Sequence, residues 1–436
     1  MTVPLTTPIP LGSGAFGSGA FDPAAFPYRF ATLPPVPPPR ADLRARLPEL
    51  LRQPTAGPPL SARAPAVIVV PDATRATFVR PMVEAVVRHL LAGGLAAADV
   101  HLLLAGGLHR PPTGDELSKL LGPEVHGRFP LHLHDADDPS LVHAGTTHRG
   151  TPVHLPRLVM EARKLVVVGG ITPHYFAGWT GGMKGLVPGA AGRQTITANH
   201  RRAVAPAAPA GLHPACREGS TRGNPVHADY VEAASFAPAP FLLNVVLGRD
   251  GEPRARVAGR PREAHRAGVR AARRAVGVRI APVPLAIVAA GDPGRERDWI
   301  QAHKIVRQGA ACVADGGVLI ALAACTDGVG SPTLLDWFSV DPARLAGDVA
   351  ERYTLHGHTA LAMRALTRRI RVFLVTSLAP EIVAKMGMTP LPSLDAALAA
   401  AAAVVPAGSA ALAIPRAGTL LPVPPAAPRS RAVRPR

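Results

Sequence analysis

The stretch KLVVVGGITPHYFAGWTGGMKG, residues 164–185, decides the fold because it joins an apolar strand to a glycine-rich loop. Its branched apolar run has no polar alternation, which is typical of a strand buried on both faces of a parallel sheet. Similar runs occupy residues 66–70, 100–107, 284–291, 316–324 and 370–377. We therefore expect an α/β fold: two domains with mostly parallel sheets flanked by helices, and an active site in the interdomain cleft.

The segments between these strands predict helices and divide the chain. Residues 80–94 have helical periodicity, residues 113–122 open with a Thr-x-x-Glu capping box, and residues 393–405 are Ala-rich. A boundary is expected within 271–283, after a basic helix. We predict a Pro/Gly-rich N-terminal lead-in (1–60), a cofactor-binding and catalytic α/β domain (61–275), a C-terminal α/β domain (284–425) and a basic tail (426–436).

Composition narrows the class of protein. The 436 residues carry a formal charge of +18, but the arginines are spread through the chain without aromatic interleaving, so a nucleic-acid partner is not favoured. No apolar run is long enough for a membrane helix and no secretory leader is evident, which predicts a cytoplasmic protein without a membrane partner. Cys216, Cys312 and Cys325 form no disulfide or zinc pattern and are expected to be buried thiols.

Lysine is scarce in this chain. There are five lysines among 48 basic residues, which leaves 43 arginines (48 minus 5). A chain that uses arginine for positive charge keeps lysine where an amine is needed, because guanidinium stays protonated and is a poor nucleophile. Lys184, in the glycine-rich loop, is therefore a candidate for chemistry.

Unusual polar residues follow three of the predicted strands. Ligands of open parallel sheets bind beyond the carboxyl ends of the strands. Two histidines from different loops can act as acid and base on a substrate, and an arginine can grip a carboxylate. Each residue alone also fits a helix cap or an ordinary loop; the joint placement favours a site. The candidates are Asp72, Thr74 and Arg75 after the first strand, His109 after the second, and His174, Lys184 and His200 after the third.

The loop GWTGGMKG, residues 178–185, resembles a phosphate cradle but is not a Walker A sequence, because glycine follows the lysine. Gly181 and Gly182 would let a bulky cofactor lie close to the main chain beside Lys184. On a later predicted helix, Gln301 and Lys304 are three residues apart and share one face, which suits either a solvated surface or the cleft.

Several separated motifs together resemble the lactate racemase family. They are DATR (72–75), GGLHRPPTGDEL (106–117), HYFAGWTGGMKGLVPG (174–189), TITANH (195–200) and QAHK (301–304). The resemblance runs from about residue 60 to 400. It implies racemisation or epimerisation at C2 of a lactate-like 2-hydroxy acid, by reversible hydride transfer to a nickel-pincer nucleotide. This cofactor is a pyridinium mononucleotide with thioamide and thiocarboxylate groups that hold Ni(II), and other proteins make it.

Site roles carried over from the family fall on matching residues. The resemblance implies a covalent cofactor tether at Lys184, a nickel ligand at His200 and catalytic acid–base groups at His109 and His174. The partners are then the 2-hydroxy acid and the cofactor-biosynthesis proteins. Two alternatives stay open: a scaffold paralogue doing other redox chemistry on a sugar acid, and a basic nucleotide- or nucleic-acid-binding protein. The remaining assignments are cofactor contacts at Asp72, Thr74, Gly181 and Gly182, and substrate contacts at Arg75, Gln301 and Lys304.

Overall fold

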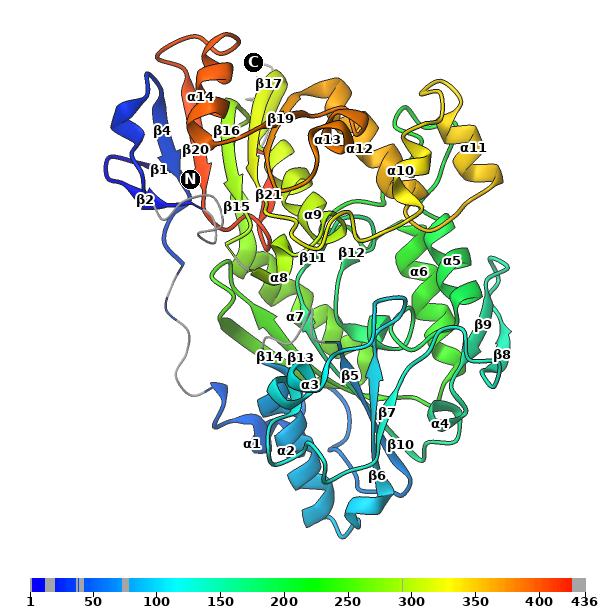
Figure 1. Ribbon diagram of the computed structural model, residues 1–436. Helices are drawn as coiled ribbons and strands as arrows, with labels where there is room; N and C mark the ends of the chain where they lie inside the picture. Colours follow the sequence, from blue (N-terminus) through cyan, green and yellow to red (C-terminus); the bar gives the residue numbers. More distant parts are fainter. Residues whose placement is uncertain are drawn as a thin grey trace, which may run out of the picture.

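A computed structural model describes residues 2–11, 20–36, 38, 43–72, 78–291 and 293–425. Two lobes are visible, each built around its own sheet (Figure 1). The lower lobe holds most of the N-terminal half of the chain, and the upper lobe holds the C-terminal half. This arrangement confirms the predicted two-domain α/β fold with mostly parallel sheets.

The sheet of the N-terminal lobe is parallel except at one edge. All of the apolar runs predicted in this half form its strands. In order across the sheet these strands are β14 (Pro253–Gly259), β13 (Phe241–Leu247), β10 (Lys164–Ile171), β5 (Ala66–Pro71), β6 (Val100–Ala105) and β7 (Leu131–Leu133).

The sheet of the C-terminal lobe is likewise parallel apart from an edge strand. The three runs predicted here are its central and adjacent strands. The order is β1 (Val3–Pro4), β4 (Arg29–Thr32), β20 (Ala410–Ile414), β16 (Val283–Ala289), β17 (Val313–Leu322), β18 (Arg371–Val375) and β19 (Thr389–Leu391).

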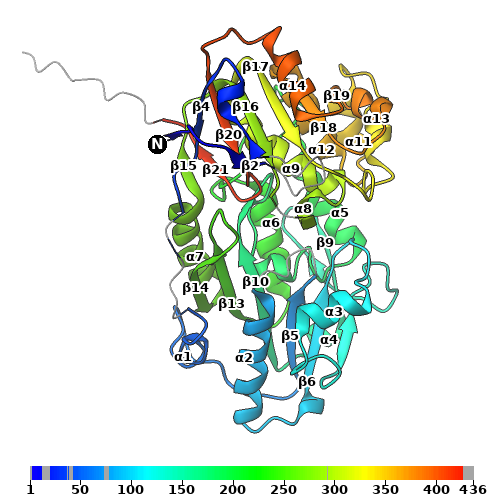
Figure 2. The same ribbon diagram turned by 60° about the vertical axis from the view of Figure 1, so that its left-hand side comes forward.

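Helices cover both faces of each sheet, as Figure 2 shows from a second side. On β5, Val67 and Val69 pack on one face while Ile68 and Val70 pack on the other, which explains why the strand sequence lacks polar alternation. The N-terminal lobe has α1 (Leu47–Arg52), α2 (Val79–Ala92), α3 (Gly114–Leu121), α4 (Arg157–Met160), α5 (Arg193–Arg201), α6 (Pro225–Ala233) and α7 (Pro261–Val276). The C-terminal lobe has α8 (Pro293–Glu296), α9 (Trp299–Ala310), α10 (Leu334–Trp337), α11 (Leu345–Glu351), α12 (Gly357–Arg369), α13 (Pro380–Lys385) and α14 (Leu394–Ala402).

Short strand pairs complete the described structure. They lie outside the two main sheets, and one of them links the lobes through strands from residues 277–279 and 421–423. The pairs are β2 (Ile9–Pro10) with β3 (Ala20–Phe21), β8 (Val142–Thr146) with β9 (Pro152–Leu155), β11 (Pro173–His174) with β12 (Gly178–Trp179), and β15 (Gly277–Arg279) with β21 (Leu421–Val423).

The structure shows side-chain caps at the starts of two of the helices that the sequence predicts. Thr113 and Glu116 form the predicted reciprocal capping box of α3, and Ser393 caps α14 by accepting a hydrogen bond from the N–H of Ala396. The three cysteines are free and buried, as expected. In the part of the chain that the structure describes, no helix has both the length and the apolar character needed to cross a membrane.

The N-terminal segment differs from the expected lead-in. Strand β4 pairs in parallel with β20, and β1 pairs with β4, so residues from the start of the chain complete the sheet of the C-terminal lobe. Helix α1 then packs against α2 in the N-terminal lobe. Proline and glycine surround these short elements in the sequence, so composition alone does not predict them. The predicted basic tail, 426–436, lies outside the described residues.

Candidate active site

A cavity of about 540 Å³ lies between the two lobes. Its N-terminal wall comes from the carboxyl ends of β5, β6 and β10 and from the glycine-rich loop, and its C-terminal wall comes from α9 and the loops at 327–333 and 355–356. Thr74 and Arg75 lie outside the described residues. The other candidates all line this cavity: Asp72, His109, His174, Gly181, Gly182, Lys184, His200, Gln301 and Lys304.

His109 and Asp72 meet because β5 and β6 are adjacent parallel strands whose ends coincide at Pro71 and Ala105. Nδ1 of His109 donates a hydrogen bond to Oδ2 of Asp72, and Asp72 is only 6% exposed. A buried carboxylate on Nδ1 fixes the ring orientation and its tautomer. Nε2 of a neutral His109 is then the nitrogen that can accept a proton.

His174 belongs to β11, directly after β10. Its ring stacks on Tyr175 with centroids 5.1 Å apart and meets the edge of Phe176 at 4.8 Å. The backbone N–H of Ala177 donates to Nδ1 of His174 over 3.2 Å. This contact places the ring proton of a neutral His174 on Nε2, so the two cavity histidines are held in opposite tautomers.

The loop before Lys184 requires glycine for space as well as for conformation. Gly181 and Gly182 have φ of 73° and 59°, and a Cβ on Gly182 would lie 2.8 Å from the His265 ring. The N–H of Gly182 donates to Oδ1 of Asn244 over 2.7 Å. The backbone is thus pinned against the sheet where a ligand can approach it closely.

Lys184 follows in a short 3-10 turn, Gly182–Gly185. Its Nζ lies 5.7 Å from the centroid of the Tyr230 ring and 6.0 Å from that of Phe176. The amine therefore enters the cavity between two aromatic faces. Such a setting restrains the side chain.

His200, on α5, is neutral at physiological pH. Burial first, and then the nearby Lys184 ammonium and the neighbouring His356 ring, lower its pKa to about 3. Its Nδ1 is buried without a hydrogen-bond partner, and a neutral imidazole is the form that binds a metal. Among the described residues no cluster of three or more His, Cys, Asp or Glu side chains is suited to a metal. A metal here would need most of its ligands from a bound cofactor.

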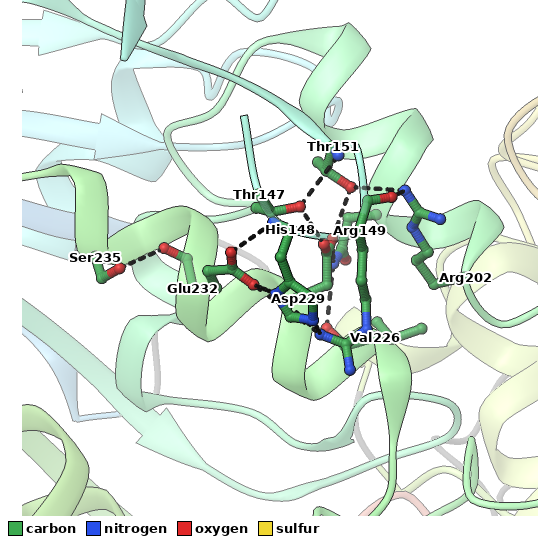
Figure 3. A network of polar contacts seen from close by, with 10 residues as sticks. Thr147, His148, Arg149, Thr151, Arg202, Val226, Asp229, Glu232 and Ser235 are labelled. Atoms are coloured by element: carbon green, nitrogen blue, oxygen red, sulfur yellow. Dashed lines mark hydrogen bonds and ion pairs between the residues drawn. The ribbon is translucent and has the colours of Figure 1, made fainter. Parts of the chain in front are cut away.

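A buried carboxylate holds α5 in place (Figure 3). Asp229, on α6 and fully buried, accepts hydrogen bonds from Oγ1 of Thr147 and Thr151 over 2.8 and 2.9 Å. Nδ2 of Asn199, the neighbour of His200, donates to the same carboxylate over 2.8 Å. The network ties the turn between β8 and β9 to the helix that carries His200.

On the opposite wall, α9 presents Gln301 and Lys304. Asp298 caps this helix by accepting from the N–H of Gln301 over 2.9 Å. Nζ of Lys304 donates to Oε1 of Gln301 over 2.6 Å, and Gln301 is 9% exposed. The shared face therefore turns to the cavity and is not a solvated surface.

Sequence reasoning missed an aromatic cluster behind the cavity. The hydroxyl of Tyr175 is hydrogen-bonded to Nε2 of His358 at 2.9 Å, and the hydroxyl of Tyr353 to Nδ1 of the same ring at 2.7 Å. The first contact joins the two lobes directly beside His174, and the second lies within the C-terminal lobe. His356 lines the cavity nearby. The signal was the pair of histidines in LHGH, residues 355–358, which no strand-end rule selects.

Comparison with known proteins gives the family. The model of the lactate racemase N-terminal domain matches residues 29–211, and that of the C-terminal domain matches residues 281–419. A lactate racemase from Thermoanaerobacterium thermosaccharolyticum is 31% identical over 317 residues, 71% of this chain and 73% of the relative. The chain belongs to the lactate racemase family.

Other members agree with this assignment. A lactate racemase from Lactiplantibacillus plantarum is 32% identical over 234 residues, 53% of this chain and 54% of the relative. Because both curated relatives are racemases, the prediction of an isomerase is confirmed.

Solved structures share the fold. The lactate racemase apoprotein from Thermoanaerobacterium thermosaccharolyticum superposes with a TM-score of 0.82 at 26% identity, covering 97% of this chain and 100% of that one. A Thermotoga maritima protein has the same fold, with a TM-score of 0.68 at 19% identity, 90% of this chain and 100% of that one being covered.

Proposed function

We propose that the protein racemises or epimerises a lactate-like 2-hydroxy acid at C2, using a nickel-pincer nucleotide joined covalently to Lys184. The observation that carries the proposal is the convergence of His109, His174, Lys184 and His200 on one interdomain cavity. Residues 61–275 would bind the cofactor and supply the acid–base groups, and residues 284–425 would close the cavity over the substrate.

The residues present fit this cofactor. Gly181 and Gly182 pack so closely on Asn244 and His265 that they admit no side chain, which leaves their backbone open to a ligand. Lys184 places an amine beside it, and His200 offers an uncharged imidazole. Asp72, with Thr74 by prediction, would support the cofactor at the end of β5. When bound, the cofactor would supply reversible hydride transfer at the substrate carbon, so that the planar 2-keto acid could be reduced on either face.

Residues of the chain itself would transfer the proton of the substrate hydroxyl and orient the substrate. His109, oriented by Asp72, would accept the proton of the substrate hydroxyl at Nε2 and return it to the same oxygen when the C2–H bond re-forms, while neutral His174 would donate a hydrogen bond from Nε2 on the other side. For the opposite enantiomer His174 would accept the proton at Nε2, which requires its own ring proton to move to Nδ1 and the hydrogen bond from Ala177 to break. Arg75 would hold the substrate carboxylate, and Lys304, braced by Gln301, would orient the substrate.

Intact mass and nickel content test the cofactor after co-expression with the cofactor-making proteins. We expect an adduct on the wild type and none on Lys184→Ala or on Lys184→Arg, which keeps the charge but not the nucleophilic amine. His200→Ala should keep the nucleotide and lose nickel. A wild type that never carries an adduct would contradict the proposal.

Substrate labelled with deuterium at C2 separates racemisation from the alternative redox chemistry on a sugar acid. A closed hydride cycle retains the deuterium in the inverted product. Net oxidation removes it and accumulates a 2-keto acid. Production of the chain without the cofactor-making proteins should give an inactive protein of unmodified mass, which is the control for both experiments.

A further inference from the structure

His356 adopts a backbone conformation that suits few side chains. Its φ is 71°, in the left-handed region, and it precedes α12 without capping that helix through its side chain. Glycine would take this conformation without strain, yet the glycine stands one position later, at Gly357. A strained non-glycine residue beside a cavity is a sign that its side chain is needed there.

The ring of His356 lines the cavity, and one of its two nitrogens is buried. Nδ1 is buried and has no hydrogen-bond partner, while the residue lines the cavity and is half-buried. Burying an unpartnered N–H is rarer than burying an unpartnered lone pair. The ring proton therefore belongs on Nε2, where it can be donated to a ligand.

The surroundings keep this donor uncharged and close to the reacting groups. Burial, followed by the charges on Lys304 and His109, lowers the pKa of His356 to about 4, and the Asp298 carboxylate opposes this shift. The ring thus stands within electrostatic reach of both a cavity lysine and the proposed base. At physiological pH it is a neutral donor.

The same wall carries apolar residues beside polar ones: Ile300, Pro332 and Leu355 line the cavity together with Ser331 and Thr333. A bound ligand would displace water from this region. A methyl group placed against His356 would leave its N–H without a partner, and unpaired polar groups discriminate strongly against a ligand that lacks the matching atom.

We propose that His356 and Lys304 form a subsite for an oxygen-bearing substituent on C3 of the substrate. The preferred substrates are then 2-hydroxy acids with a hydroxyl or carboxylate at C3, and lactate, with its methyl group, binds more weakly. This inference rests on the proposed function, in which Arg75 holds the C1 carboxylate and Lys304, hydrogen-bonded to Gln301, contacts the substrate.

Isothermal titration of the cofactor-loaded enzyme with racemic glycerate and racemic lactate tests the subsite. Racemic ligands are already at the equilibrium of the reaction, so the heat reports binding. One hydrogen bond should make glycerate bind roughly 3- to 10-fold more tightly than lactate. His356→Met, which has similar length and no N–H, should bring the ratio close to one, whereas His356→Gln, which keeps a donor, should retain most of it.

The melting temperature and adduct mass of each variant serve as controls for folding and cofactor loading. Equal affinity of the wild type for the two acids would overturn the subsite, and so would an unchanged ratio in His356→Met. In both cases measurable binding would leave the racemase proposal standing. If neither acid binds the wild type, the proposed function fails and the subsite fails with it.

Discussion

The imidazole of His109 is held by Asp72, a carboxylate that is almost completely buried at the end of the neighbouring strand. This pairing resembles the support that an acid gives to a catalytic histidine in other enzymes: it selects the tautomer and stabilises the imidazolium once the proton has been taken. It also makes Asp72 more than a cap on the following helix.

Asp72→Asn should therefore lower kcat of the loaded enzyme by roughly 10²- to 10⁴-fold, because the amide no longer favours the proton on Nδ1 of His109. Steady-state kinetics in both directions would measure the loss. Adduct mass and nickel content should match the wild type. Loss of the adduct would show instead that Asp72 acts on the cofactor.

Gly182, in the loop before Lys184, and Gly127, in an open turn, offer a matched pair of substitutions. Gly182→Ala forces a Cβ to within 2.8 Å of His265 at a φ of 59°, whereas Gly127→Ala meets no atom within 4 Å at a φ of 75°. Backbone strain alone should cost both variants about 1–2 kcal/mol. Urea unfolding should show a larger loss for Gly182→Ala, which should also carry less adduct by mass; equal losses would contradict the packing role of this glycine.

Asp229 is expected to position His200 through α5. Asp229→Ala leaves the hydroxyls of Thr147 and Thr151 without an acceptor and removes one of the two acceptors of the Asn199 amide. We expect a loss of about 3–5 kcal/mol in the free energy of unfolding. Nickel per adduct should fall as the helix shifts.

Glu232, on the same helix, gives the control (Figure 3). It pairs with His148 at the surface, so Glu232→Ala should cost at most about 1 kcal/mol and leave nickel retention unchanged. Similar effects of the two substitutions would mean that α6 stabilises the lobe without positioning His200.

Acid should destabilise the apoprotein well before its carboxylates titrate. Burial is the main cause that lowers the pKa of a group of histidines, to about 3 in His200 and about 4 in His227 and His356, and well below the usual value in His303 and His358. In the unfolded chain these groups titrate near 6.5. Their contribution is fully present above pH 6.5 and is lost as pH falls toward 4.

Each such histidine adds up to about 1.4 kcal/mol per pH unit to the slope of unfolding free energy against pH. Urea unfolding between pH 7.5 and 5 should show this decline. His303→Leu, which replaces a ring whose two nitrogens are buried without partners, should reduce the slope by about one proton. A flat profile would mean that these rings take up protons in the folded state.

Much of the fold follows from sequence because parallel strands buried on both faces leave long apolar runs. The same rule places His109 and His174, since the ends of parallel strands meet at one edge of the sheet. This rule does not predict His356, because His356 precedes a helix and its position near His109 depends on how the two lobes pack. Strand β4 is not predicted for another reason: its four residues, RFAT, form too short an apolar run to be distinguished from the surrounding proline-rich sequence.

The pairing of β4 with β20 sets an order of events during synthesis. Residue 29 leaves the ribosome long before its partner at residue 410 is made, so β4 can pair with β1 but lacks its other neighbour until almost the whole chain has been translated. The corresponding edge of β20 stays unpaired until β4 adds to it. Closure of the second sheet is therefore a late step of folding, and a fragment that begins at residue 281 would lack the strand that closes it.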